Sequence, residues 1–461
     1  MKFRRILTQN SLSKQLLLGL MISGLTTVGN IAAPVTSSPV PGPESAATWE
    51  YAIPPALPDM GTPSQGMLSV QAEDGKWGFI KLPERTQSFA ANQALPYVIP
   101  PRFQPTEWYG KPTFLPGKRA VVSENGEDYI LVDSSGNRHE VPFDLEETNI
   151  GFSHGLAIVQ KTVKGERRYG AIDQDWNLVV PIRFSLLDDF TEDGMAWVTY
   201  PAGNGQWFWG VINRKGTLVQ DLSPLGFGNV GFVGPTSLKN SFWVELKEGM
   251  AILDCGMNSA TSHPIYFRIP PIYRGITNWV DGRALARTKT GTTVLINSSG
   301  EVLREVAVTP AIIGIGPNAF EGSLDFWGTF VIAETRRTAD YWHIGRVFDL
   351  DGNDLLGTEV NLWTQNEYWT EELYAVQDVA TKKWGFLDRA GKLRIPQNDE
   401  QENPPRFSEG VAAMEVNGKF GYIDHDGKEF IPFIFDGASD FSEGYAVVLV
   451  GDKYGLIRKK D

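Results

Sequence analysis

One short pattern of residues recurs along this chain and constrains its fold more than any other feature. Residues 418–436 read GKFGYIDHDGKEFIPFIFD, and the same skeleton returns in KKWGFLDRAGKLRIPQ, RRYGAIDQDWNLVVPIRF and WFWGVINRKGTL. Each copy has an aromatic–glycine pair, an aliphatic residue followed by Asp or Asn, a turn, and often Ile-Pro or Val-Pro. The recurrence predicts tandem copies of one β-hairpin unit.

The turn of this hairpin has a fixed chemistry. A short polar side chain at its first position can accept hydrogen bonds from the turn backbone, and a glycine three residues later takes the left-handed conformation that closes the loop. These pairs are Asp133 and Gly136, Asn213 and Gly216, Asn297 and Gly300, Asp349 and Gly352, Asp388 and Gly391, and Asp424 and Gly427. A further copy keeps Asp173 but has Trp176 in the glycine position, and the following Asn177 would allow its turn to shift by one residue.

The aromatic–glycine pair predicts close packing within and between the units. A glycine in a strand lets an aromatic ring or another backbone lie flat against it. One aromatic side chain at a fixed place in each unit predicts a spine of packed rings, and a ligand-stacking role for some of these rings is the alternative. The pairs are Trp77–Gly78, Tyr169–Gly170, Trp209–Gly210, Trp384–Gly385, Phe420–Gly421 and Tyr454–Gly455.

A second segment precedes each hairpin. FSEGVAAMEV at 407–416 and FSEGYAVVLV at 441–450 are near copies, and we expect their glycine to open a strand. The copy YWTEELYAV at 368–376 lacks that glycine and is predicted to be distorted. Pro181, Pro396 and Pro432 each stand eight residues beyond the turn Asp. Proline has no backbone donor, so it closes a strand or lies on a sheet edge.

These segments together make units of about three strands. Gly385 and Gly421 are 36 residues apart, and Gly421 and Gly455 are 34 apart. The 48 glycines, 29 prolines and 14 tryptophans suit short strands joined by tight turns. We predict an all-β fold over 64–461: a tandem array of antiparallel repeats, either a superhelical solenoid or a propeller-like ring. The repeats are clear at 152–220 and 368–461 and degenerate at 222–278 and 305–365.

The pattern resembles the WG-repeat family, bacterial proteins built from tandem aromatic–glycine hairpin units. The resemblance extends over most of residues 64–461 and is strongest in the clear repeats. It implies an extracytoplasmic or cell-surface repeat protein, and it supplies no catalytic residues to assign.

The first residues predict an export signal and a linker. Basic residues precede an apolar run at 16–25, and small residues follow, which is the order of a secretory signal peptide. We expect residues 1–33 to be removed, leaving a periplasmic or secreted protein; an uncleaved membrane anchor is the alternative. Residues 34–63 are rich in Pro, Ser and Ala and are predicted to form a disordered linker.

Few residues suggest chemistry. The formal charge of −13 argues against nucleic acid and anionic membrane as partners.

Cys255, with His263 eight residues away, is interpreted as a packed, inert thiol. Residues 349–359 resemble a calcium loop, but their glycine is fourth rather than sixth. The acids at Asp188, Asp189, Glu192 and Asp193 are interpreted as a solvated loop. We therefore predict no catalytic, metal-binding or cofactor-binding residues.

Two functions of different class remain. The first is an exported, non-enzymatic repeat protein whose surface binds a protein or a glycan. The alternative is a carbohydrate-active enzyme that uses loop carboxylates, such as those between Asp188 and Asp193, with aromatic side chains as sugar platforms.

Overall fold

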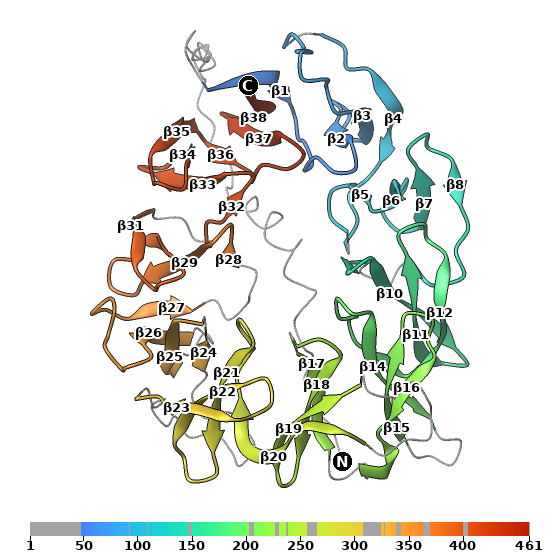
Figure 1. Cartoon of the computed structure of the whole chain (residues 1–461). Coiled ribbons are helices and arrows are strands. Elements are labelled where there is room, and N and C mark those ends of the chain that lie inside the picture. The colour runs from blue at the N-terminus through green and yellow to red at the C-terminus, as the bar shows by residue number, and fades with distance from the viewer. Residues whose placement is uncertain are drawn as a thin grey trace, which may run out of the picture.

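Antiparallel strands form eight sheets arranged around a ring (Figure 1). The computed structural model describes residues 48–460 except 92, 108, 146–149, 202–206, 226–229, 237, 256–264, 308–323, 327, 338–342, 363–368 and 400–403. These residues contain no α-helix and one short 3-10 turn, η1 (Ser223–Leu225). The prediction of an all-β repeat array is confirmed, and the array is a propeller-like ring rather than an open superhelix.

The strands follow one another from sheet to sheet in chain order. The first two sheets are β2 (Met67–Gln71), β3 (Trp77–Lys81) and β4 (Tyr97–Phe103), then β5 (Phe114–Leu115), β6 (Arg119–Ser123), β7 (Tyr129–Asp133) and β8 (Arg138–His139). The next two are β9 (Phe152–Ser153), β10 (Leu156–Val163), β11 (Glu166–Asp173) and β12 (Leu178–Phe184), then β13 (Leu186–Leu187), β14 (Met195–Pro201), β15 (Trp207–Asn213) and β16 (Leu218–Asp221).

Two larger sheets each span two repeat units. The seven-stranded sheet contains β17 (Val230–Pro235), β18 (Ser241–Leu246), β19 (Gly249–Asp254), β20 (Phe267–Ile276), β21 (Arg283–Thr288), β22 (Thr293–Asn297) and β23 (Val302–Glu305). The eight-stranded sheet contains β24 (Leu324–Phe326), β25 (Phe330–Arg337), β26 (His343–Asp349), β27 (Val360–Leu362), β28 (Trp369–Thr370), β29 (Leu373–Asp378), β30 (Trp384–Leu387) and β31 (Leu393–Asp399).

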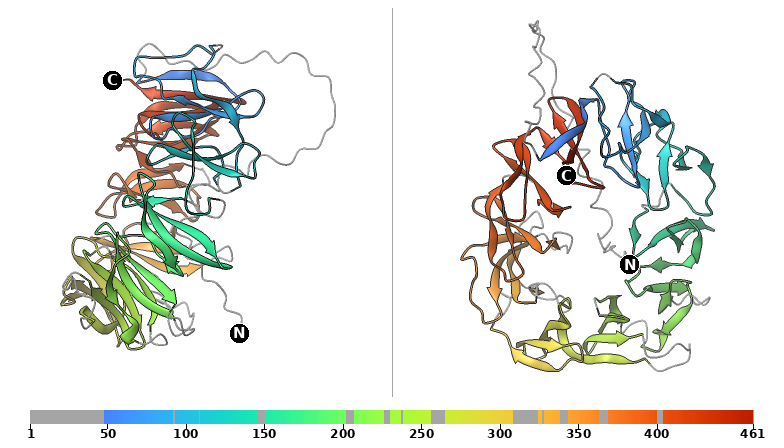
Figure 2. Two further views of the ribbon diagram at one scale, coloured as in Figure 1. Left: turned by 90° about the vertical axis from the view of Figure 1, so that its right-hand side faces the viewer. Right: turned by 45° about the horizontal axis from the view of Figure 1, so that its top comes forward.

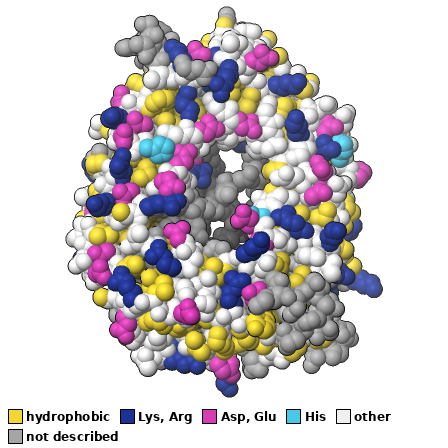
Figure 3. All heavy atoms as spheres, viewed as in Figure 1, with side chains coloured by type: hydrophobic (Ala, Val, Ile, Leu, Met, Phe, Trp, Pro, Cys, Tyr) yellow, Lys and Arg dark blue, Asp and Glu magenta, His cyan; other side chains and the backbone are white. Residues whose placement is uncertain are grey.

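The last two sheets complete the ring. One contains β32 (Phe407–Ser408), β33 (Val411–Val416), β34 (Lys419–Ile423) and β35 (Glu429–Phe435). The other contains β36 (Gly437–Ala438), β37 (Tyr445–Val450), β38 (Lys453–Lys459) and, from the opposite end of the chain, β1 (Trp49–Leu57). The side view shows that the ring is puckered rather than flat (Figure 2). The space-filling view shows the opening at its centre (Figure 3).

Strand β1 closes the ring by pairing antiparallel with β38, from Trp49 opposite Lys459 to Leu57 opposite Tyr454. The predicted linker over 34–63 is therefore wrong for its second half, because residues 49–57 form an ordered strand with buried side chains. Pro54 and Pro55 are compatible with this strand because β1 is the last strand of its sheet, where a missing backbone donor is tolerated. Its register with β38 shifts twice, so buried and exposed residues do not alternate regularly along this strand, and the sequence shows no strand pattern.

Most units have a fourth, very short strand that the sequence analysis did not predict. In the FSEG segment at 407–410 the Phe and Ser form this strand, and a two-residue turn leads into the next one. In the last sheet the short strand is Gly437–Ala438, ahead of the second FSEG segment. Both turn residues have positive φ, 54° at Glu409 and 85° at Gly410, as in a type I′ hairpin. The copy without glycine makes the same turn with Glu371 at 49° and Glu372 at 72°, so its predicted distortion is not found.

The turn glycines are close to the preceding unit as well as left-handed. Gly427 has φ 76°, and a Cβ placed on it would lie 3.1 Å from Cγ2 of Ile395. Trp176 occupies the equivalent position with φ 68°, so that turn does not shift towards Asn177. Its indole Nε1 donates to the carbonyl of Pro116 at 2.8 Å, and its ring stacks on Phe143. These contacts with the neighbouring sheet hold a bulky residue where glycine is usual.

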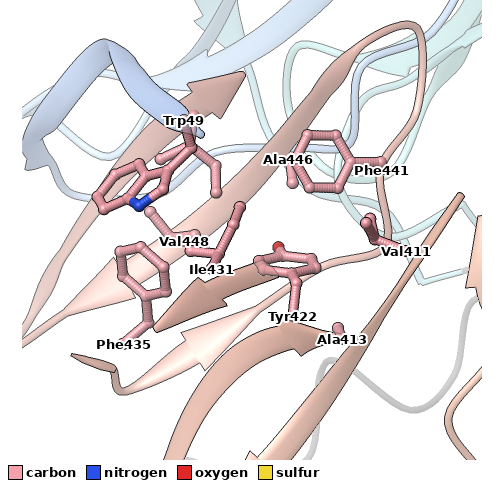
Figure 4. Close-up of a cluster of buried hydrophobic side chains, with 10 residues drawn as sticks. Trp49, Val411, Ala413, Tyr422, Ile431, Phe435, Phe441, Ala446 and Val448 are labelled. Atoms are coloured by element: carbon pink, nitrogen blue, oxygen red, sulfur yellow. The ribbon is translucent and has the colours of Figure 1, made fainter. Parts of the chain in front are cut away.

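The hydrophobic core lies between successive sheets. One cluster joins the last two sheets and is drawn in Figure 4; it contains Trp49 from β1, Tyr422 from β34, Phe435 from β35 and Val448 from β37. Trp49 meets Phe435 edge to face, with ring centroids 5.4 Å apart. Comparable clusters join the other neighbouring sheets. Each unit thus buries its apolar face against the next, as in other repeat arrays.

Candidate functional site

The FSEG turns carry a ladder of carboxylates that links neighbouring units. The side chain of Glu371 accepts from the backbone N–H of Gly410 at 3.0 Å, and Glu409 accepts from Gly444 at 3.1 Å. Glu443 accepts from Gln65 and Gly66, each at 2.8 Å. Because Gln65 lies near the start of the described chain and Glu443 near its end, the same contact that joins neighbours also closes the ring.

A serine in three of these turns repeats the pattern. Ser408 donates to the carbonyl of Phe441 at 2.7 Å, Ser442 to that of Pro63 at 3.0 Å, and Ser64 to that of Phe114 at 2.7 Å. In Figure 1 the strands β28 and β32, which lead into these turns, lie nearer the central opening than β31 and β35. Because the acids at these turns accept hydrogen bonds from the backbone of the neighbouring unit, we assign them a structural role.

Replacing Glu443 by alanine is expected to lower the free energy of unfolding by about 1 kcal/mol, since two backbone donors lose a charged acceptor that remains partly in solvent. Urea unfolding followed by circular dichroism measures this change. Glu429→Ala removes an exposed carboxylate outside these turns and serves as the comparison. An effect of Glu443→Ala no larger than that of Glu429→Ala would contradict the ladder.

Two of the four acids at 188–193, Asp188 and Asp193, are held by hydrogen bonds to neighbouring groups. One carboxylate oxygen of Asp188 accepts from the indole N–H of Trp197, and the other accepts from the backbone of Asp189 at 2.9 Å. Asp193 accepts from the backbone N–H of Asn240 in the next sheet at 2.8 Å. Asp193 is thus another link between units, and Asp188 fixes a tryptophan of its own sheet.

Ser153, His154 and Asp189 resemble a hydrolytic triad in composition but not in geometry. Nδ1 of His154 lies 3.1 Å from Oγ of Ser153 and 2.9 Å from the carbonyl oxygen of Phe190. A triad uses the two ring nitrogens for different partners, one for the nucleophile and the other for the orienting acceptor. Here both contacts fall on one nitrogen. Burial and the charge of Asp188 raise the pKa of Asp189, while His154 lowers it.

The other candidate residues also have structural surroundings. Burial raises the pKa of the Cys255 thiol to about 12, so the thiolate is not available near neutral pH; His263 lies outside the described residues. Asp349 accepts from the backbone of Asp351 and Asn353 as the turn residue of its unit. Asp354 pairs with Arg346 at 2.7 Å. Within the described part of the chain, no group of three or more His, Cys, Asp or Glu side chains is placed to hold a metal ion.

The glycines of the aromatic–glycine pairs face the backbone of the adjacent strand. A Cβ on Gly170 would lie 2.5 Å from the carbonyl oxygen of Val180, and one on Gly421 would lie 2.7 Å from that of Ile431. The register of the strand pair shifts at these places. A side chain at either of these glycines would force the strands apart, so the close approach there is between backbones. At Gly78 an added Cβ would also lie 2.9 Å from a ring carbon of Tyr97.

The aromatic members of the pairs differ in burial. Trp77 and Trp384 are fully buried, whereas Tyr169, Trp209, Phe420 and Tyr454 are half-buried. Trp209 stacks on Trp197 of its own sheet, with centroids 5.2 Å apart and planes 8° apart. Lys111 lies over the rings of both Trp77 and Tyr454, which come from neighbouring sheets. The burial and contacts of these aromatic side chains therefore differ from unit to unit. The stacking of Trp209 on Trp197 lies within one sheet and does not join neighbouring units.

A surface patch that the sequence analysis did not identify lies on the outer side of the seven-stranded sheet. The rim patch consists of Tyr266, Ile272, Val302 and Leu303, which are 48–54% exposed, against 37–41% for the other exposed large hydrophobic residues described. The turn at Gly300 packs against the buried Ile269 and Tyr273 of β20, so β20 and the turn that leads into β23 are neighbours in space. Hydrophobic side chains gather there along the lower edge of Figure 3, over β19 to β23.

The fold defines a propeller-like ring of antiparallel sheets built from repeated hairpins. The family model of the WG containing repeat matches residues 169–200 and 420–454, so the chain carries WG repeats. The resemblance inferred from the aromatic–glycine pattern is confirmed. No curated protein matches the sequence.

Solved structures with some similarity share little sequence with this chain. BamB from Moraxella catarrhalis is 10% identical with a TM-score of 0.30, over 70% of this chain and 99% of that one. A eukaryotic initiation factor is 10% identical with a TM-score of 0.32, over 72% and 95%. Hsv2 from Kluyveromyces lactis is 11% identical with a TM-score of 0.27, over 65% and 95%. In the described residues, no helix is long and apolar enough to cross a membrane.

Proposed function

We propose that this protein is an exported, non-enzymatic scaffold that binds a partner protein through the rim patch. The observation that carries the proposal is that, among the described residues, the four most exposed large hydrophobic side chains lie in or directly beside one sheet of the ring. Contiguous exposed apolar surface on a folded protein commonly marks an interaction site. The proposal of export rests on the predicted signal peptide at residues 1–33.

The placement of the patch supports this function. Tyr266 and Ile272 belong to the degenerate stretch 222–278, where the repeat pattern is weak. The acids and glycines of the clear repeats are committed to turns and to contacts between units. Residues released from the repeat pattern are available for recognition, and here they present apolar side chains to solvent.

A partner that covers the patch should lose affinity when the patch becomes polar. We expect the double variant Ile272→Ser, Leu303→Ser to capture its partner about tenfold less well or worse, since burying either aliphatic side chain contributes on the order of 1.5–3 kcal/mol. Cross-linking and mass spectrometry of the mature protein in envelope extract would measure capture. The control is Val163→Ser, Leu186→Ser, which changes two exposed aliphatic residues elsewhere on the ring. Equal capture by wild type and both variants would contradict the proposal.

The alternative, a carbohydrate-active enzyme, has less support. Glycoside hydrolysis uses two carboxylates that face each other across a bond. Both oxygens of Asp188 are already hydrogen-bonded, and Trp197 and Trp209 each cover one face of the other. Assays against a panel of envelope glycans, with the double variant Asp188→Asn, Asp189→Asn alongside, test this alternative. Turnover by the wild type that the double variant lacks would favour the enzyme over the scaffold as the function of this protein.

A further inference from the structure

Most of the outermost strands of the ring are protected by proline. Strands β4, β12, β20, β31, β35 and β1 all contain it, and in the clearest repeats it stands eight residues beyond the turn acid, as at Pro181, Pro396 and Pro432. A proline at a sheet edge removes the backbone donor to which another strand could bond. The repeated proline therefore disfavours the pairing of another strand with the outer edge of these sheets.

Strand β23 lacks this protection. Counted from its turn residue Asn297, Glu305 stands at the position of Pro432, and Arg304 stands at the position of the buried Ile431. The other proline-free outer strands differ from β23: β8 has two residues, β16 is half-buried, and β27 is paired on both sides. All four residues of β23 are exposed. Among the outer strands described, this is the one with an exposed, proline-free edge.

The hydrogen-bond pattern places a backbone donor on that edge. Arg304 pairs with Leu295 of β22, and the N–H of Val306 donates to the carbonyl of Thr293 at 3.0 Å. Because backbone groups alternate sides along an antiparallel strand, the N–H of Glu305 faces away from β22. Val302 and Leu303 stand beside this donor with half of their surface exposed. A backbone donor next to aliphatic side chains suits an extended polypeptide segment better than a helix or a sugar.

The ring already contains one outer strand that comes from a distant part of the chain. β1 lies at the opposite end of the described chain and pairs with β38 as the outermost of four strands, the place that β12 and β35 hold in their sheets. An outer position of the ring can therefore be filled by a segment that does not follow directly in the sequence. A second copy of this chain is a poor occupant of β23, because each copy carries a formal charge of −13 and the two would repel each other.

We propose that β23 is a strand-addition site, at which an extended segment of the partner protein pairs with the edge around Glu305 and packs aliphatic side chains on Val302 and Leu303. This inference rests on the proposed function and specifies the kind of segment that the scaffold recognises. Main-chain bonds supply affinity in such complexes, and the neighbouring side chains supply selectivity.

Two substitutions at one position separate the backbone from the side chain. Glu305→Pro removes the edge donor and restores the residue that other units have at this place, so it is compatible with the fold. Glu305→Gln removes the charge and keeps the donor. The probe is a displayed library of random linear peptides, selected on the full-length ring, and thermal melts confirm that both variants are folded.

Selected peptides should bind wild type and Glu305→Gln equally and bind Glu305→Pro at least about tenfold more weakly, the equivalent of about 1.4 kcal/mol. N-methylation of single peptide amides should weaken binding at alternate positions. Peptides that bind Glu305→Pro as well as wild type, or a library that yields none able to distinguish the two, would overturn strand addition. Self-association in sedimentation experiments that Glu305→Pro abolishes would assign the edge to a second copy and overturn the proposed partner.

Capture from envelope extract distinguishes the two proposals. If Ile272→Ser, Leu303→Ser loses the partner and Glu305→Pro keeps it, the rim patch binds without strand addition, and only this further inference falls. If neither variant changes capture, the rim patch itself is wrong as the binding surface.

Discussion

Replacing Trp49 by alanine will lower the free energy of unfolding by about 3–5 kcal/mol, the range found for truncating a large buried aromatic side chain. Trp49 is 1% exposed and packs edge to face on Tyr51 and Phe435, with centroid distances of 5.1 and 5.4 Å. It also anchors β1, the strand that joins the two ends of the described chain. The loss therefore combines a cavity in the core with a weakened closure of the ring.

Urea unfolding followed by far-ultraviolet circular dichroism measures this loss without relying on tryptophan fluorescence. Val163→Ala removes exposed apolar atoms from β10 and should change the free energy of unfolding by less than about 0.5 kcal/mol. Limited proteolysis should also cleave the Trp49→Ala variant faster within residues 48–63. A Trp49→Ala protein that unfolds within about 1 kcal/mol of wild type would show that β1 contributes little to closing the ring.

The repeated part of the fold was predictable because its determinants are local. A turn such as that of Asp424 and Gly427 is completed within a few residues, and the side chain and glycine act on their own backbone. The hairpin, its turn and its closing proline can therefore be inferred from residues close together in the sequence. The same locality explains why the family resemblance could be identified from short motifs.

The closure of the ring was not predictable in the same way. Trp49, Ala52 and Ile53 are buried, but register shifts after Tyr51 and after Ile53 break the alternation that identifies a strand. The segment is also rich in proline, which normally argues against strand. Its partner, β38, lies about as far away in the sequence as the described chain allows. Only the three-dimensional arrangement identifies 49–57 as a strand.

The roles of the acids depend on similarly distant partners. Glu443 bonds to Gln65, and Asp193 bonds to Asn240, so neither contact is visible as a spacing within one repeat. The rim patch could not be predicted for a different reason. Val302 and Leu303 are ordinary strand residues in the sequence, and they become a candidate binding surface because nothing described packs over them. Exposure of a side chain is a property of the assembled ring, not of a motif.

Replacing Gly427 by valine should be far more destabilising than removing the turn acid beside it. Gly427 has φ 76°, where a β-branched residue is strained by about 1–3 kcal/mol or more. A Cβ would also lie 3.1 Å from Cγ2 of Ile395, so the branched methyl groups would press on the preceding unit. We expect a loss of at least about 3 kcal/mol in the free energy of unfolding from the two effects together.

The matched substitution Asp424→Ala keeps the glycine and removes the side-chain acceptor. Asp424 accepts from the backbone N–H groups of Asp426 and Lys428, each at 2.9 Å, and both donors remain accessible to water. Its loss should therefore reach only about 1 kcal/mol. Thermal and urea unfolding of the two variants gives the comparison. If Gly427→Val unfolds like wild type, or if the two losses are equal, then neither the left-handed backbone nor the contact with Ile395 governs this position, and the repeated glycine must have another cause.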